Sequence, residues 1–330
     1  MSIAPLYVWD GISPKPQLTF VDLHWHSEFS LKDGMIRILD PHDSKHNKGE
    51  SVLVAERRGM GFVTCTDHGN MYGQAQLAST AKKYGLKHAP ACEFYVAPQS
   101  RHEKSATKGD IIYYHMCAWA KNKEGYKNLC ILQKLSYTEG FYHRPRIDKE
   151  LIDKYGDGIM WSDGCIAGPI SQQIIRDNDK VAREWFDWLI NRFKGDFYME
   201  YQNHGIPDEE KANNVKIDWA NEHGIPIIAT TDAHFYNKED EDAHRALLCI
   251  QWSKWFDDPT FSGFSGSGYW MMDNDELLER FPIEYLNNTK LVADKVEESI
   301  IEFGKTVLPQ FKVPQSFLQV IGGGNDVVAR

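Results

Sequence analysis

The sequence has few features of a membrane protein or of a secreted protein held together by disulfides. Its 330 residues contain no long apolar run and no recognisable signal peptide, which argues against a membrane span and against export. The six cysteines form no Cys-x-x-Cys pair, and several lie in apolar runs where reduced cysteine acts as a small hydrophobic side chain. These absences favour a cytoplasmic location, where thiols stay reduced.

Basic charge is also scarce. The chain carries 37 basic and 47 acidic residues, for a net charge of −10. This balance argues against a protein that coats DNA through its overall charge, although it permits a local basic groove. Carboxylates that bind divalent cations would also make a metal-free sequence look acidic.

Apolar residues make up 42% of the chain, enough for one large α/β domain or two smaller ones. Short apolar runs predict strands at residues 20–26, 62–67, 89–96, 111–120, 158–162, 197–202 and 226–232. Amphipathic patterns predict helices at residues 51–58, 74–84, 123–135, 181–193, 209–222, 274–281 and 284–301. Strands alternating with helices indicate βαβ units and a mostly parallel sheet, and about seven units favour a β/α barrel with its site at the C-terminal strand ends.

The expected organisation has four parts. Residues 1–17 form an N-terminal extension, 18–245 the barrel core, 246–314 a C-terminal extension and 315–330 a disordered tail. Residues 41–49 and 99–110 are polar and predict loops. His42 and His46 lie in the first of these loops, and we do not expect them to bind metal.

The most informative motif is Asp-Leu-His-Trp-His-Ser at residues 22–27. Residues two apart on a strand point the same way, so His24 and His26 can reach one metal ion. Asp33 follows in a turn. A single His-x-His also occurs as an ordinary surface or core pair, so this motif alone does not establish a metal site.

Polar residues recur where other expected strands end. They are Asp67, His68, Glu93, His115, Asp163, Cys165, Asp232 and His234. A barrel brings its strand ends together around one axis, so these positions would converge. Nitrogen, carboxylate and thiolate donors together suit zinc, or manganese and iron where oxygen dominates.

Each of these residues has an ordinary explanation when taken alone. His115 would be a hydrogen-bonded core histidine, Asp67 a turn cap and Cys165 a structural thiol, and His204 is expected in a solvated loop. Glu93 would be costly to bury without partners. Taken together, the ordinary explanations would bury several unpaired polar groups near one another, so the pattern favours a metal site.

The sequence resembles the PHP (polymerase and histidinol phosphatase) family, and most of all the PHP domain at the N-terminus of bacterial DNA polymerase III alpha subunits. The resemblance runs from about residue 20 to residue 314. The segments that carry it are FVDLHWHSEFSLKDG (20–34), TDHGNMYG (66–73), CEFYVAP (92–98), AKNKEGYKN (120–128), YTEGFYHRPRID (137–148) and VLPQFKVP (307–314).

The resemblance implies a distorted seven-stranded β/α barrel with a trinuclear metal site. Its ligands would be His24, His26, Glu93 and Asp232 for one ion, Glu93, His115 and Cys165 for a second, and Asp33, His68 and His234 for a third. The cofactors would be two to three divalent ions of zinc, manganese or iron, with magnesium also possible.

The activity that the resemblance implies is metal-dependent hydrolysis of phosphoesters, as a 3′→5′ exonuclease that trims a primer strand during proofreading. We expect Glu93, Asp232 and His26 to act in catalysis. Asp67 is expected either to orient His68 or to cap its own turn.

A basic and aromatic segment lies at residues 137–146. Arg144 and Arg146 can grip a phosphate backbone, and Tyr137, Phe141 and Tyr142 can stack on an unpaired base. The expected partners are therefore the single-stranded 3′ end of DNA and a replicative polymerase or its separate catalytic fragment, with no membrane.

Two other functions remain open. One is a small-molecule phosphatase of the histidinol-phosphate type, which the polymerase-like segments 137–148 and 307–314 argue against. The other is a non-catalytic scaffold of a split polymerase, because bound metals can be purely structural. The polymerase palm does not follow these residues, so we expect no polymerase activity from this chain alone.

Overall fold

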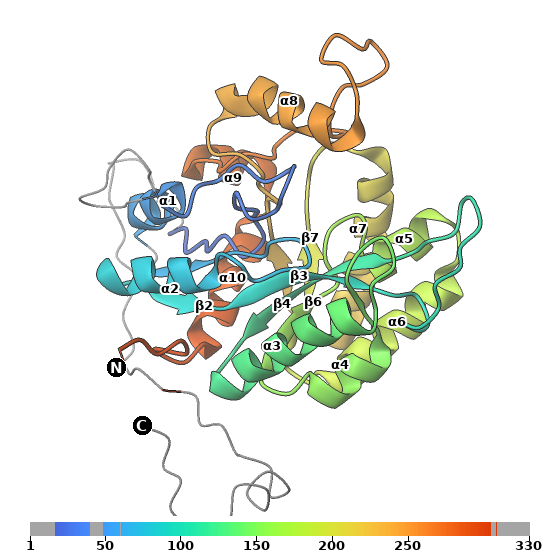
Figure 1. Cartoon of the computed structure of the whole chain (residues 1–330), viewed down its shortest axis with the longest axis horizontal. Coiled ribbons are helices and arrows are strands. Elements are labelled where there is room, and N and C mark those ends of the chain that lie inside the picture. The colour runs from blue at the N-terminus through green and yellow to red at the C-terminus, as the bar shows by residue number, and fades with distance from the viewer. Residues whose placement is uncertain (1–16, 40–48, 60, 305–307, 309–330) are drawn as a thin grey trace, which may run out of the picture.

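A computed structural model describes residues 17–39, 49–59, 61–304 and 308, which form an α/β fold with one mixed sheet and one parallel pair of strands (Figure 1). Strands β1 (Phe62–Thr64) and β2 (Lys87–Ala89) form a parallel pair. The larger sheet has the order β5 (Arg146–Ile147), β3 (Ala91–Val96), β4 (Tyr114–Ala120), β6 (Ile159–Ser162), β7 (Phe197–Tyr201) and β8 (Ile227–Ala229).

Helices follow most strands. They are α1 (Glu50–Arg58), α2 (Gln74–Lys83), α3 (Lys123–Thr138), α4 (Lys149–Tyr155), α5 (Pro169–Ile175), α6 (Asp179–Arg192), α7 (Pro207–His223), the 3₁₀ turn η1 (Lys238–Asp240), α8 (Glu241–Trp252), α9 (Asn274–Arg280) and α10 (Ile283–Lys295). Each predicted helix is present, although α10 ends six residues early. The sequence patterns missed α4, α5 and α8.

The expected mostly parallel sheet is wrong at its centre. Strand β4 runs antiparallel to both of its neighbours, β3 and β6, whereas the other pairs are parallel. The chain between β3 and β4, residues 97–113, contains no helix. Without a crossover helix the chain returns directly alongside β3, which gives antiparallel pairing.

The expected strand at residues 20–26 is also absent as a regular strand. Trp25 makes a single bridge with Ala233, and its carbonyl oxygen accepts a hydrogen bond from Thr66 N at 3.1 Å. Its own N–H donates to the Thr66 hydroxyl rather than to a backbone oxygen, which interrupts the ladder. A second single bridge joins His68 to Glu93.

The expected strand at residues 89–96 is divided in two. Pro90 separates β2 from β3, because proline has no N–H to donate to a ladder. The two halves therefore join different sheets, with β2 pairing with β1 and β3 pairing with β4.

Alternate residues of the larger sheet point to opposite faces, and a different helix covers each face. On one face Phe94 packs with Leu129 of α3, and on the other Ala91 packs with Val292 of α10. Because successive side chains of a strand point to opposite faces, Glu93 shares the face of Ala91. This second face is apolar at one end and carries the polar site residues at the other.

The expected boundary after residue 245 falls inside α8, and α9 and α10 contribute side chains to the same core as the strands. The expected extension at 1–17, the 41–49 loop with His42 and His46, the 307–314 segment and the tail at 315–330 lie outside the described residues, apart from residues 17, 49 and 308. Among the described helices, none is both long and apolar enough to cross a membrane.

Candidate metal centre

Glu93 lies at the middle of a buried group of polar side chains. It projects from β3 with only 1% of its surface exposed. Its Oε1 atom lies 3.0 Å from His115 Nδ1 and 3.4 Å from His24 Nε2. Its Oε2 atom lies 3.6 Å from His26 Nε2 and contacts His68 Nδ1. A single carboxylate therefore faces four imidazoles.

Asp232 follows β8 and closes the group on another side. Its Oδ1 atom lies 3.0 Å from His26 Nε2 and 3.3 Å from His24 Nε2. The residue has a φ of 49°, in the left-handed region that costs most side chains energy and that aspartate tolerates better than most. Strain of this kind persists where the surroundings fix it, and it clusters at functional sites.

His68 and His234 extend the group towards Asp33. The donor nitrogens of His26, His68 and His234 lie within 4.8 Å of one another. His68 Nε2 lies 3.6 Å from Asp33 Oδ2. These contacts bring together the three residues that the resemblance assigns to one ion.

Cys165 reaches the group from the turn after β6. Its sulfur lies 3.7 Å from Glu93 Oε1 and 3.7 Å from His115 Nδ1. The preceding residue, Gly164, has a φ of 76°, and a Cβ atom there would lie 2.4 Å from the carbonyl oxygen of His115. Glycine thus lets the turn approach β4 closely enough to place the thiol beside the histidine.

Hydrogen bonds hold three of the histidines from behind. His24 Nδ1 lies 2.5 Å from Glu200 Oε1, and His26 Nδ1 lies 2.9 Å from Ser30 Oγ. His234 Nδ1 lies 2.7 Å from a backbone oxygen two residues earlier. Metal-binding histidines are commonly fixed in this way, with one ring nitrogen bonded behind and the other facing the ion.

Several atoms of the group lack a hydrogen-bond partner among the described residues. They are His24 Nε2, Asp33 Oδ1 and His234 Nε2, whereas His68 Nδ1 and Glu93 Oε2 contact each other. Buried polar atoms without partners are costly, so such a concentration indicates a missing binding partner. Imidazole, carboxylate and thiol donors fit zinc, manganese or iron.

Burial and neighbouring charges shift the pKa values of the group in opposite directions. Burial lowers the pKa of His26 well below its usual value, and His68 lowers it further. Burial also opposes charge on His68, but Asp33 and Glu93 raise its pKa to about 9. Burial alone would raise the pKa of Glu93, yet the imidazoles, His115 foremost, hold it well below its usual value. Glu93 is therefore an anion near neutral pH, as cation binding requires.

Comparison with known proteins matches residues 22–204, more than half of the chain, to the PHP domain. The chain belongs to the PHP family. This confirms the assignment that the sequence motifs predicted.

Curated relatives of this PHP chain are DNA polymerase III alpha subunits. The chain is 34% identical to that of Borreliella burgdorferi over 90% of its own length and 25% of the relative. Identity is 32% with the Treponema pallidum subunit, over 91% of this chain and 25% of the relative, and 32% with the Thermus aquaticus subunit, over 91% and 24%. The chain therefore spans about a quarter of the length of these relatives.

The structure brings all nine predicted ligands into one group, and their metal-binding role stays a prediction. Asp67 is fully buried, and its carboxylate accepts hydrogen bonds from Ser27 N, Ser27 Oγ and Ser30 Oγ at 2.8–2.9 Å. Ser30 Oγ also contacts His26 Nδ1 and accepts a hydrogen bond from the His68 backbone N–H, so Asp67 supports the turn beside both histidines. Its role in catalysis stays a prediction.

Arg146 is held by the fold, and its predicted role in substrate binding stays a prediction. The side chain is buried, and its guanidinium donates to backbone carbonyl oxygens of Gly140, Ile112, Arg101 and Glu103. With its donors engaged by these four carbonyl groups, Arg146 fastens the 99–110 loop to β5.

Arg144 occupies a different setting, at the edge of the site. It is exposed, its guanidinium lies 5.7 Å from the centre of the Tyr95 ring, and it hydrogen bonds to Tyr113. The Tyr95 ring centre lies 6.0 Å from that of His68 and 5.2 Å from that of His115. Arg144 is thus one aromatic ring away from the predicted ligands, and its role in substrate binding stays a prediction.

Sequence reasoning missed Glu200, a buried carboxylate in β7. It accepts hydrogen bonds from Ser162 Oγ and Thr230 Oγ1, both at 2.5 Å, and from Gln202 Nε2 at 3.1 Å. Burial raises its pKa, but His24 and these donors hold the pKa below its usual value. A glutamate within the apolar run Phe-Tyr-Met-Glu-Tyr was the available signal.

The expectation of a solvated His204 is also wrong. The ring is 4% exposed, with Nδ1 2.8 Å from Glu209 Oε1 and Nε2 3.0 Å from the carbonyl oxygen of Thr231. It stacks on Tyr269 at 4.1 Å. His204 therefore braces the segment that precedes Asp232 and does not join the group of predicted ligands.

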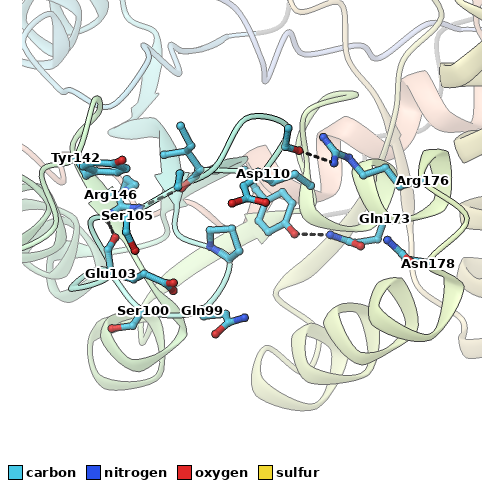
Figure 2. A pocket seen from close by; sticks show the side chains of 16 residues that line it. Gln99, Ser100, Glu103, Ser105, Asp110, Tyr142, Arg146, Gln173, Arg176 and Asn178 are labelled. Carbon is cyan, nitrogen blue, oxygen red and sulfur yellow. Dashed lines mark hydrogen bonds between the residues drawn. The ribbon is translucent and has the colours of Figure 1, made fainter.

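A cavity of about 380 Å³ lies on the other side of β4, under the 99–110 loop (Figure 2). Tyr114 faces this cavity, where its hydroxyl accepts a hydrogen bond from Gln173, while His115 faces Glu93. Neighbouring residues of a strand point to opposite faces, so the cavity is separate from the candidate metal centre.

Proposed function

We propose that this chain is a metal-dependent phosphoesterase that acts as a 3′→5′ exonuclease on single-stranded DNA ends. The observation that carries the proposal is the group around Glu93, in which imidazole and carboxylate atoms lie within 4.8 Å of one another and several buried atoms have no hydrogen-bond partner among the described residues. Such an arrangement suits divalent ions far better than it suits a metal-free core.

The proposed ligand sets follow the contacts. One ion would lie between His24, His26, Glu93 and Asp232, a second between Glu93, His115 and Cys165, and a third between Asp33, His68 and His234. Bound ions would supply a hydroxide near neutral pH and neutralise charge on the phosphate oxygens.

The chain's own residues fix the donors before substrate arrives. Glu200 and Ser30 hold His24 and His26 from behind, so both rings present Nε2 to the centre. Glu93 offers both oxygens and would bridge neighbouring ions. Preorganised donors of this kind need little rearrangement during the reaction.

Arg144 and nearby exposed aromatic rings support nucleic acid as the substrate. Arg144 would hold a phosphate at the edge of the centre. Tyr137 and Phe141 belong to the same 137–146 segment as Arg144. Tyr137 is 40% exposed, Phe141 is 50% exposed, and their ring centres lie 6.3 Å apart. Flat exposed rings suit stacking of unpaired bases.

We further infer that the strands close into the distorted barrel that the resemblance implies. The single bridges support this, because Trp25–Ala233 links the N-terminal segment to the end of β8 and His68–Glu93 links the end of β1 to β3. Such a closure would explain why donors from distant parts of the chain converge.

The proposed setting is DNA replication, because the relatives are replicative polymerase subunits. The partner would be a polymerase catalytic region, either in the same longer chain or as a separate fragment, and the location would be cytoplasmic.

The test is removal of nucleotides from a 3′-labelled primer by purified protein, with and without added Mn²⁺ or Zn²⁺. Asp232→Asn and Glu93→Gln are the test variants, and Glu150→Gln, which is exposed, is the matched control. We expect metal-dependent trimming that both test variants abolish and the control retains.

A phosphate monoester is assayed beside the primer. Hydrolysis of the monoester without trimming would favour the small-molecule phosphatase. If folded, metal-loaded protein hydrolyses neither substrate, an enzymatic role is contradicted, and the non-catalytic scaffold becomes the favoured function.

A further inference from the structure

The segment after α8 concentrates aromatic residues beside the candidate metal centre. Trp252 is the last residue of α8, and Trp255, Phe256, Phe261 and Phe264 follow it. From residue 252 to 270 every apolar side chain except Pro259 is aromatic. In Figure 1 the chain after α8 forms a loop that extends away from the sheets. The remaining residues of this loop are small or polar, so the rings are its main contact surface.

Ring contacts connect the centre to this loop. The Phe264 ring centre lies 4.8 Å from that of His234, at an interplanar angle of 83°. Trp252 lies 6.1 Å from Phe264 and 5.1 Å from Phe261. These three rings and Trp255, in the same loop, are called the aromatic strip.

The outer rings of the strip are exposed. Trp255 is 81% and Trp252 42% exposed. A contiguous patch of exposed apolar side chains marks an interaction site, whereas single exposed residues are common. Because the strip begins against His234, its occupant must be compatible with a substrate held at the candidate metal centre.

The charges beside the strip are already paired. Lys254 Nζ lies 3.2 Å from Asp258 Oδ2, and Arg245 Nη2 lies 3.3 Å from Asp242 Oδ1. The strip therefore offers flat rings with little free positive charge. That chemistry suits the faces of nucleobases and contributes little to holding phosphates.

We propose that the aromatic strip is a stacking surface for bases of the single strand whose 3′ end lies at the metal centre. The proposal rests on the proposed function and adds to it a base-binding surface on the side of His234. Arg144, on the side of His68 and His115, would hold the backbone, so the two features would divide base and phosphate binding between them.

The test is binding of a short labelled oligothymidylate, and of an abasic strand of equal length, measured by fluorescence anisotropy in the presence of a chelator. Wild type should prefer the base-containing strand by roughly tenfold, because stacking contributes on the order of 1–3 kcal/mol per base. The double variant Trp252→Ala/Trp255→Ala should lose this preference, and Trp252→Tyr, which keeps a ring, should largely retain it.

Phe303→Ala is the control, since Phe303 is 43% exposed and outside the strip. The preference should also survive added salt, because stacking releases no counterions. Equal affinity of wild type for the two strands, an undiminished preference in the double variant, or no binding of either strand would overturn the proposal.

Hydrolysis of bis(p-nitrophenyl) phosphate with added Mn²⁺ separates this proposal from the proposed function. This ester carries no nucleobase, so its hydrolysis reports on the metal centre and not on base stacking. Wild-type activity on it, together with equal binding of the two strands, would overturn the stacking surface alone. Base-dependent binding without hydrolysis of this ester or of a primer would support the strip while contradicting the enzyme.

Discussion

The group around Glu93 and the cluster around Arg101 are both buried and charged, but their polar atoms are partnered differently. Arg101 donates to Asp148 and to Glu139 and Glu150, with distances of 2.8–3.1 Å. Around Glu93, by contrast, several donor atoms face one another without a hydrogen-bond partner among the residues described.

The difference distinguishes buried charge that supports the fold from buried charge that awaits a ligand. The Arg101 guanidinium already has carboxylate partners that neutralise its charge, so it does not require a further ligand. Imidazole and carboxylate atoms without partners carry a desolvation cost that a bound cation would offset. Changes in the first cluster should therefore affect stability, and changes in the second should affect metal binding.

The largest expected effect is on the Arg101 cluster. Asp148→Ala leaves the buried guanidinium of Arg101 without its best-buried partner and removes the N-cap of α4. We expect the free energy of unfolding to fall by about 3–5 kcal/mol, measured by urea denaturation, with metal content unchanged.

Glu150→Ala is the matched control for that change. Glu150 contacts the same guanidinium, but its side chain is 73% exposed, so its removal should cost far less. Equal losses in the two variants would show that burial does not set the cost in this cluster.

Glu200→Gln tests the second half of the comparison, that changes near Glu93 affect metal binding. The substitution preserves size but weakens the hydrogen bond that orients His24. We expect metal affinity to fall by roughly 10–100-fold, measured by titration of chelator-treated protein. Glu209→Gln, which alters the carboxylate bonded to His204, is the comparison and should leave metal affinity nearly unchanged.

Arg144 and Arg146 allow the same comparison between a residue proposed to bind a ligand and a residue that stabilises the fold. Arg144→Ala should raise KM for a DNA substrate roughly tenfold with little change in stability, because the exposed guanidinium contacts phosphate in the proposed function. Arg146→Ala should lower stability instead, because it removes four bonds to backbone carbonyls. Steady-state kinetics and urea denaturation of both variants distinguish the two roles, and a reversed pattern would contradict them.

The smallest expected effect concerns acid stability away from the centre. Burial lowers the pKa of His88 from 6.5 to about 3, and its Nε2 atom lies 3.1 Å from Gln74 Oε1. Between these values the unfolded state binds a proton that the folded state does not, so stability falls as pH drops below about 6.5. His88→Gln should reduce the slope of unfolding free energy against pH by up to about 1.4 kcal/mol per pH unit. An unchanged slope would show that His88 is protonated in the fold.

The predicted ligands were recognisable from sequence because their residue types and positions are distinctive. His24 and His26 share a two-residue spacing, and Asp232 and His234 repeat it at the end of another strand. Glu93 stood out because a buried acid needs partners. The full set of nine positions followed from the family resemblance, and the structure shows that they converge.

Other features depend on contacts that the sequence does not record. The direction of β4 is an exception, because the polar loop predicted at residues 99–110 already left no helix between the strands on either side of it. Arg144 and Arg146 have the same side chain, and only the carbonyl groups around Arg146 separate their roles. Glu200 lacked a spacing partner, so its contact with His24 became visible only in the fold.

The most direct test of the central claim is calorimetric titration of Mn²⁺ and Zn²⁺ into chelator-treated protein, for wild type and Glu93→Gln. We predict saturable binding of two or three ions by wild type, and loss of at least one ion in the variant. Folded wild-type protein that binds neither metal, or a variant that binds both as wild type does, would contradict a metal centre at Glu93.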